Sequence, residues 1–227
     1  MSSIEQADLT DIATYGYRNE RWNFVEGEAQ VGIINKLNKE QNRYVINAQT
    51  SRVVWRTLTF YTGATLVRVV DYSWSPHGLA MYFFGLRGQY RRMDGSRHLL
   101  SFLNEQIPLK LTAQNVPEYL KFFCFFVRYH GRPFILVEHP DDIGYCEPPL
   151  TPAQSAALSP HLHPITLLAD RGDAGYLLKA TVRYSDMLFD AEFEVLPNGQ
   201  VQMLQDSVTG TFIPVPNGVD AAPAWAA

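Results

Sequence analysis

The feature that most constrains the fold is residues 116–129, where apolar side chains are dense enough to cover most of a helix circumference. Such a helix must be enclosed on more than one side, because a surface helix carries a single apolar stripe. Asn115 is a suitable N-cap residue, and Glu118 lies where its carboxylate can reach back to the cap amide. Gly131 is placed to end the helix, and the apolar pattern of residues 133–138 indicates a short buried strand. We predict a core helix that leads directly into a sheet.

Residues 53–93 consist of four short segments rich in β-branched and aromatic side chains, with turn residues between them. This spacing is typical of an antiparallel meander. Residues 79–84 are apolar on both faces, which predicts a central strand covered on both sides. Before this region, apolar side chains at spacing four predict a helix over residues 26–41, and residues 1–25 have the alternation expected of an arm laid over the body.

The last third of the chain predicts a second meander. Residues 176–184 and 187–195 alternate apolar and polar side chains, as two strands with one face in water would. A two-residue turn pairs Tyr184 with Met187 and places Lys179 opposite Glu192. The polar face predicted to meet water carries six residues, which are Lys179, Thr181, Arg183, Asp190, Glu192 and Glu194.

The strand register determines the length of the turn that follows Val195. A two-residue turn would pair Val195 with Gln202 and send apolar side chains to the wrong face. A three-residue loop over residues 197–199, with Gly199 at positive φ, instead pairs Val195 with Val201. We predict the longer loop, and no regular pattern after Asp206.

Together these patterns predict an α+β fold that is predominantly antiparallel sheet, with meanders at about residues 53–93 and 164–206 packed around the buried helix at about 116–129. Residues 139–164 hold six of the fourteen prolines and are interpreted as a connector. This divides the chain into an N-terminal α+β region at 1–138 and a C-terminal meander and tail at 165–227, within one compact domain or two.

Composition narrows the function classes. A net charge of −4 and a pI near 5.8 argue against broad binding to nucleic acid or anionic membranes, since both depend on Lys and Arg. No segment approaches 18 uncharged apolar residues and the N-terminus lacks a signal-peptide pattern, which predicts a cytoplasmic protein. The two cysteines, Cys124 and Cys146, form no CxxC motif and are predicted to be reduced. No motif predicts a cofactor.

The connector collects most of the reactive side chains. His139, Cys146, His161 and His163 could ligate a zinc-like ion, although their spacing matches no known signature and loop histidines are the simpler interpretation. His139, Asp141 and Cys146 are the alternative catalytic set. The acidic neighbours of Cys146 would raise the pKa of its thiol rather than favour the nucleophilic thiolate.

Two further groups are candidate binding residues. Arg91 and Arg92, with Tyr90, form a basic segment that could hold a phosphate, or could simply protect a strand edge by charge. The second group is aromatic and lies outside clean strand alternation, as is common at binding surfaces; it consists of Tyr72, Trp74 and His77.

The function hypothesis is a non-enzymatic binding module for a protein partner or a small apolar or aromatic ligand, because no catalytic motif is present and a helix packed on a curved sheet often encloses a pocket. Self-association is a further expectation. The alternative is a hydrolase-type enzyme, with or without a metal ion, that uses residues 139–163 as its active-site loop.

Overall fold

The structure is a computed structural model that describes residues 22–40, 45–71, 73, 80–129, 132–143, 150–184 and 187–212. The described residues form two compact units. One contains the described residues up to Thr59 together with Gly63–Asp94, and the other contains Phe60–Thr62 and the described residues from Gly95 to Phe212. Helices and antiparallel sheets occur in both, which confirms the predicted α+β class.

The first unit is a five-stranded antiparallel sheet whose strands follow the order of the chain. The four predicted segments are confirmed as β2 to β5, and a short strand before them adds to the edge. The strands are β1 (Asn23–Val25), β2 (Ser51–Thr57), β3 (Ala64–Asp71), β4 (Ala80–Leu86) and β5 (Gln89–Arg92). β4 lies between two neighbours and its five middle residues are buried, as its apolar sequence predicts.

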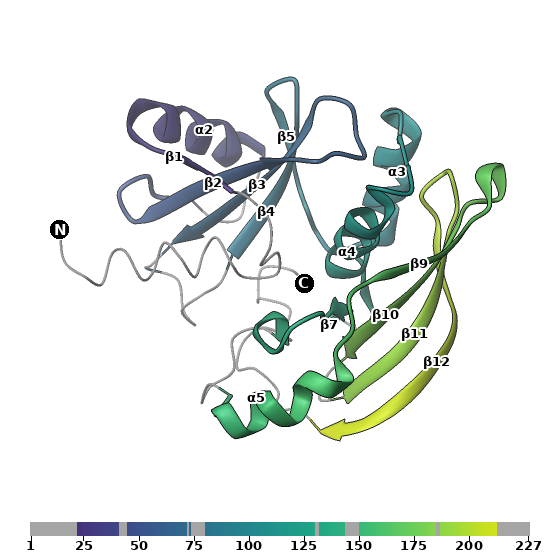
Figure 1. Cartoon of the computed structure of the whole chain (residues 1–227). Helices are drawn as coiled ribbons and strands as arrows, with labels where there is room; N and C mark the ends of the chain where they lie inside the picture. Colours follow the sequence, from purple (N-terminus) through teal and green to yellow (C-terminus); the bar gives the residue numbers. More distant parts are fainter. Residues whose placement is uncertain are drawn as a thin grey trace. The chain divides into compact units, whose positions relative to one another are not determined.

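One face of this sheet is covered by helix α2 (Gly27–Glu40), which confirms the helix predicted at 26–41 (Figure 1). Ile34 and Leu37 of the helix are almost fully buried and join a cluster with sheet residues such as Val67 and Phe83. Burial of apolar side chains on both elements holds the layers together. The first meander therefore has a helical partner of its own.

The second unit contains two longer helices, a short one and a second five-stranded sheet (Figure 1). Its helices are α3 (Arg97–Gln106), α4 (Val116–Phe126) and α5 (Pro152–Leu158). The sheet consists of β8 (Ile135–Leu136), β9 (Thr166–Asp170), β10 (Tyr176–Tyr184), β11 (Met187–Val195) and β12 (Val201–Phe212). A separate two-stranded ribbon is formed by β6 (Arg128–Tyr129) and β7 (Arg132–Pro133), and single 3-10 turns lie at Pro140–Ile143, Ser159–His161 and Gly172–Ala174.

Helix α4 is the predicted core helix, with two corrections at its ends. It stops at Phe126 rather than at residue 129, because Val127 is already extended and the chain enters β6. At the start, Asn115 makes no capping bond with its side chain. Its side-chain oxygen accepts a hydrogen bond from the Thr112 amide, and its own amide donates to Thr112.

The predicted register of the second meander is confirmed. β10 and β11 pair Tyr184 with Met187 and Lys179 with Glu192. β11 and β12 pair Val195 with Val201, and Gly199 has φ of +81°, as the three-residue loop requires. The hydrophobic pattern selected the loop because a one-residue slip would have exposed the apolar face.

Two features of this sheet differ from the prediction. β12 continues to Phe212, whereas no pattern was expected after Asp206; register shifts in its pairing with β11 interrupt the alternation that would have revealed the strand. The polar face of β10 and β11 is also not exposed to solvent along its whole length. Thr181 and Arg183 are each only 1% exposed.

The cover over that end of the face comes from the connector. Leu158 at the end of α5 and Leu162 beyond it pack with Ile135, Val137 and Leu188 in one buried cluster. Thr151 begins α5, since its side chain and that of Gln154 form the capping box that opens this short helix. A segment distant along the chain thus buries part of a strand face that looks solvent-exposed in sequence.

Polar contacts fix the β11–β12 loop to the helices. The Tyr119 hydroxyl on α4 donates to the Gly199 carbonyl at 2.7 Å and accepts from the Asn104 amide group of α3 at 2.9 Å. Tyr61 donates to the Asn104 side-chain oxygen. Burial raises the pKa of Tyr119, so it stays a neutral donor.

We predict that Gly199→Ala lowers the free energy of unfolding by roughly 2–4 kcal/mol. An added Cβ would lie 2.4 Å from the Tyr119 hydroxyl and 2.2 Å from the Asn104 amide nitrogen, in a backbone conformation that already disfavours L side chains. Gly172→Ala is the matched control, because φ is also positive there but nothing lies within 4 Å of the added atom. It should cost about 1 kcal/mol. Urea denaturation of both variants compares them, and equal losses would contradict the prediction.

Candidate functional site

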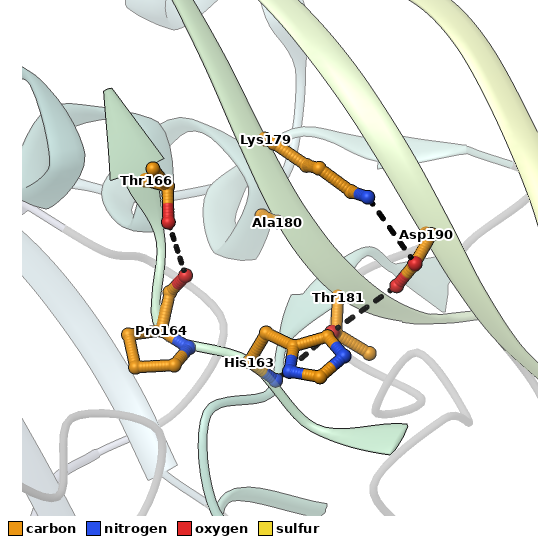
Figure 2. Close-up of a pocket in the computed structure, with 7 residues that line it drawn as sticks. All are labelled: His163, Pro164, Thr166, Lys179, Ala180, Thr181 and Asp190. Atoms are coloured by element: carbon orange, nitrogen blue, oxygen red, sulfur yellow. Dashed lines mark hydrogen bonds and ion pairs between the residues drawn. The ribbon is translucent and has the colours of Figure 1, made fainter. Parts of the chain in front are cut away.

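The second unit contains a hollow of about 340 Å³ on the outer face of its sheet (Figure 2). It lies where one edge of β10 changes partner: Lys179 is the last residue paired with β9, and Val182 is the first paired with β8. Between them, Ala180 and Thr181 have β11 as their strand partner. The lining residues are His163, Pro164, Thr166, Lys179, Ala180, Thr181 and Asp190. The hollow therefore follows from the strand topology.

Thr181 is the buried polar centre of this hollow. Its hydroxyl accepts a hydrogen bond from the His163 amide at 3.2 Å and lies 3.3 Å from the His161 carbonyl, to which it can donate. Across the sheet, Thr181 pairs with Asp190, and the hydroxyl is 3.5 Å from the Asp190 Oδ1 atom. One hydroxyl thus fixes the end of the connector against the wall of the hollow.

Lys179 and Asp190 bring opposite charges to the same wall. The Lys179 ammonium lies 3.5 Å from the Asp190 Oδ2 atom, and both side chains project from the outer face of the sheet (Figure 2). The Lys179 side chain is 46% exposed and that of Asp190 is 26% exposed. A pair this accessible to water contributes little to stability, so both groups can be redirected toward a ligand at small cost.

Glu138 joins the two ends of the connector. Its carboxylate forms an ion pair with Lys121 of α4 and accepts a hydrogen bond from the Ile165 amide at 2.9 Å. Burial opposes ionisation of Glu138, but the hydrogen bonds from Lys121 and Ile165 outweigh it and hold the pKa of its carboxyl below the usual value. The segment that carries His163 and Pro164 over the hollow is thereby anchored at its base.

The predicted connector residues are placed only in part. The backbone amide of His139 donates to the Asp142 carboxylate at 2.8 Å, and the side chains of His139, His161 and His163 are exposed. His163 is the one that lines the hollow. Cys146 lies outside the described residues, and the side chain of Asp141 is not described either.

The predicted metal and catalytic sets therefore stay predictions. Within the described ranges, no three His, Cys, Asp or Glu side chains gather where they could hold a metal ion. Cys124, in contrast, is confirmed as a buried thiol that forms no disulfide. Burial raises the pKa of Cys124 to about 12, which removes it as a nucleophile at neutral pH.

The predicted binding residues of the first unit lie on β5 or outside the described chain. Tyr72, Trp74 and His77 belong to the undescribed part. Tyr90 is half-buried against the cluster beneath α2, and its ring packs beside Gly85, so its faces are less available for stacking than the sequence suggests. On the same strand, Arg91 is exposed and Arg92 is half-buried.

Sequence reasoning did not single out Lys179, Thr181 and Asp190 as a site. They fit the alternation of a solvated strand face, and the sequence gives no signal that the connector closes over one end of that face. The register that places Thr181 opposite Asp190 was predicted, but the charged partner predicted for Lys179 was Glu192 rather than Asp190.

In the described part of the chain, no helix is both long enough and apolar enough to cross a membrane. Comparison of the sequence and structure with protein-family models, curated proteins and solved structures finds no match.

We predict that Glu138→Gln lowers the free energy of unfolding by about 1–2 kcal/mol at pH 7, because a charge-assisted bond to Lys121 is lost. Since the folded state depresses the pKa of Glu138, this contribution is present above the unfolded-state pKa of about 4.3 and is lost as pH falls through the lower folded-state value. Urea denaturation between pH 7 and pH 3 measures the difference between wild type and variant.

The control is Glu194→Gln, which removes the partner of the more exposed Arg171 and should cost less than about 0.5 kcal/mol. A difference between wild type and Glu138→Gln that stays constant down to pH 3 would contradict the assigned role of Glu138.

Proposed function

We propose that the chain is a non-enzymatic binding module and that its second unit holds a small polar molecule in the hollow beside β10. The observation that carries this proposal is a cavity of about 340 Å³ whose wall combines a buried hydroxyl, Thr181, with two redirectable charges, Lys179 and Asp190. Ligand sites are concave and use a few fixed polar groups to orient the ligand, and this volume lies at the small end of their range.

The lining favours a polar ligand over the apolar or aromatic one suggested by the sequence. Among the described residues, no Phe, Tyr or Trp lines the hollow. Most of the accessible lining is carbon surface, and five of the seven lining residues carry hydrogen-bonding side chains, the exceptions being Pro164 and Ala180. A polar molecule can satisfy these groups, but an apolar one would strip water from them without replacing their hydrogen bonds.

Binding is favoured over catalysis because the Thr181 hydroxyl, the group that would have to act as nucleophile, already forms hydrogen bonds with the backbone. The Thr181 hydroxyl contacts the backbone at both His161 and His163, and its main acidic neighbour, Asp190, shares its charge with Lys179. An activated nucleophile needs an adjacent general base that is itself oriented for proton transfer. The arrangement serves to position a ligand better than to attack one.

The test is to block the hollow. Thr166→Trp places a large side chain at its rim, and we expect small polar metabolites that give saturation-transfer NMR signals with the wild type to lose at least about nine-tenths of that signal. Leu168→Trp is the control, because residue 168 lies two positions along β9, is exposed and does not line the hollow. The proposal would be overturned if the ligands bound equally well to the wild type and to Thr166→Trp. It would also be overturned if no ligand distinguished Thr166→Trp from Leu168→Trp.

A further inference from the structure

The outer wall of the hollow presents one positive and one negative group close together, and this pattern limits the ligand more than the volume does. We propose that the hollow is selective for a zwitterion, a small molecule with an ammonium group and a carboxylate on neighbouring atoms, such as a free amino acid. This inference rests on the proposed ligand-binding function and adds the chemical class of the ligand.

The geometry places the two charges as a complementary pair. Lys179 and Asp190 come from adjacent strands in diagonal positions, and their charged atoms are 3.5 Å apart, at the long end for an ion pair. A zwitterion that enters between them exchanges one weak internal pair for two contacts, its carboxylate meeting Lys179 and its ammonium meeting Asp190. Because both protein charges are already partly exposed, little desolvation precedes this exchange.

A ligand with a single charge forms only one of these two charged contacts. An anion that pairs with Lys179 leaves Asp190 without its cation and lies beside a like charge, and a cation that pairs with Asp190 meets the ammonium of Lys179. Unfavourable contacts of this kind produce selectivity against the wrong ligand. The wall therefore favours molecules that carry both charges.

Thr181 fixes the direction in which the ligand enters. The Asp190 Oδ1 atom lies toward the buried hydroxyl and the Oδ2 atom toward Lys179 (Figure 2). The acid is thus the inner group and the more exposed ammonium the outer one. We expect the ammonium end of the ligand to lie deeper, with its carboxylate toward the mouth and His163 and Thr166 beside its remaining polar groups.

The experiment compares three probes of nearly equal size and shape: L-serine, which carries both charges, glycerate, which has a hydroxyl in place of the ammonium, and serinol, which has a hydroxymethyl in place of the carboxylate. Binding to the wild type is measured at pH 7 by NMR chemical-shift titration. We expect L-serine to bind about tenfold more tightly than either single-charge probe.

Charge-removing variants then assign the effect to the two residues. Lys179→Met and Asp190→Asn should each weaken L-serine binding by about tenfold, whereas Asp190→Asn should strengthen glycerate binding, because the like charge is gone. The control is Arg171→Met with Glu194→Gln, which removes a second ion pair of this unit outside the hollow. It should leave all three affinities unchanged.

Glycerate or serinol binding as tightly as L-serine would overturn the zwitterion inference, and so would undetectable L-serine binding. The proposed function can survive that failure: if Thr166→Trp abolishes binding of other small molecules while L-serine never binds, the hollow is a ligand site for a different class. If no molecule distinguishes Thr166→Trp from Leu168→Trp, both proposals fall.

Discussion

A helix with apolar side chains around most of its circumference must be enclosed on more than one side, and the second unit is built around this constraint. Eight of the eleven residues of α4 are buried. The aromatic rings on this helix pack with one another and with Phe60, for example Phe122 against Phe126 at 4.9 Å between ring centroids. Such contacts are non-directional, so they enclose the helix without fixing its neighbours in register. The register comes from the one polar tip on its buried side, the Tyr119 hydroxyl.

That hydroxyl connects the helix to the sheet, and the sheet in turn produces the hollow. The Tyr119 bond to the Gly199 carbonyl fixes the β11–β12 loop, and the β10–β11 pairing follows from the same hydrophobic alternation. With β10 fixed, its free edge must be covered by two separate short partners, β9 and β8, because the connector leaves and re-enters the sheet between them. At this change of partner the Thr181 carbonyl still accepts a hydrogen bond from the Val137 amide, but neither β8 nor β9 pairs with Ala180 and Thr181, and a cavity can form there.

The elements that follow from local pattern could be predicted from sequence, and those that depend on distant segments could not. Alternation and turn chemistry identified β2 to β5, β10 and β11, and the register test at Gly199 distinguished two loops that differ by one residue. The helix end at Phe126 was missed because the residues after it are apolar enough to continue a helix and enter a ribbon instead. The far half of β12 was missed because its bulges break the period of two.

The candidate site shows why a correct secondary structure is not enough to find a pocket. The charges of Lys179 and Asp190 and the hydroxyl of Thr181 were all placed on the right face of the right strands, yet such a face is what a solvated sheet also presents. Arg183 is a clearer example, because it is a charged residue on a face predicted to be solvent-exposed and yet it is only 1% exposed. The connector reaches this face of the sheet in both places: Leu158 and Leu162 pack on Leu188, the strand partner of Arg183, and the His163 amide contacts Thr181. A polar strand face becomes a site only when a non-local segment covers part of it, and no periodicity within the strand records that cover.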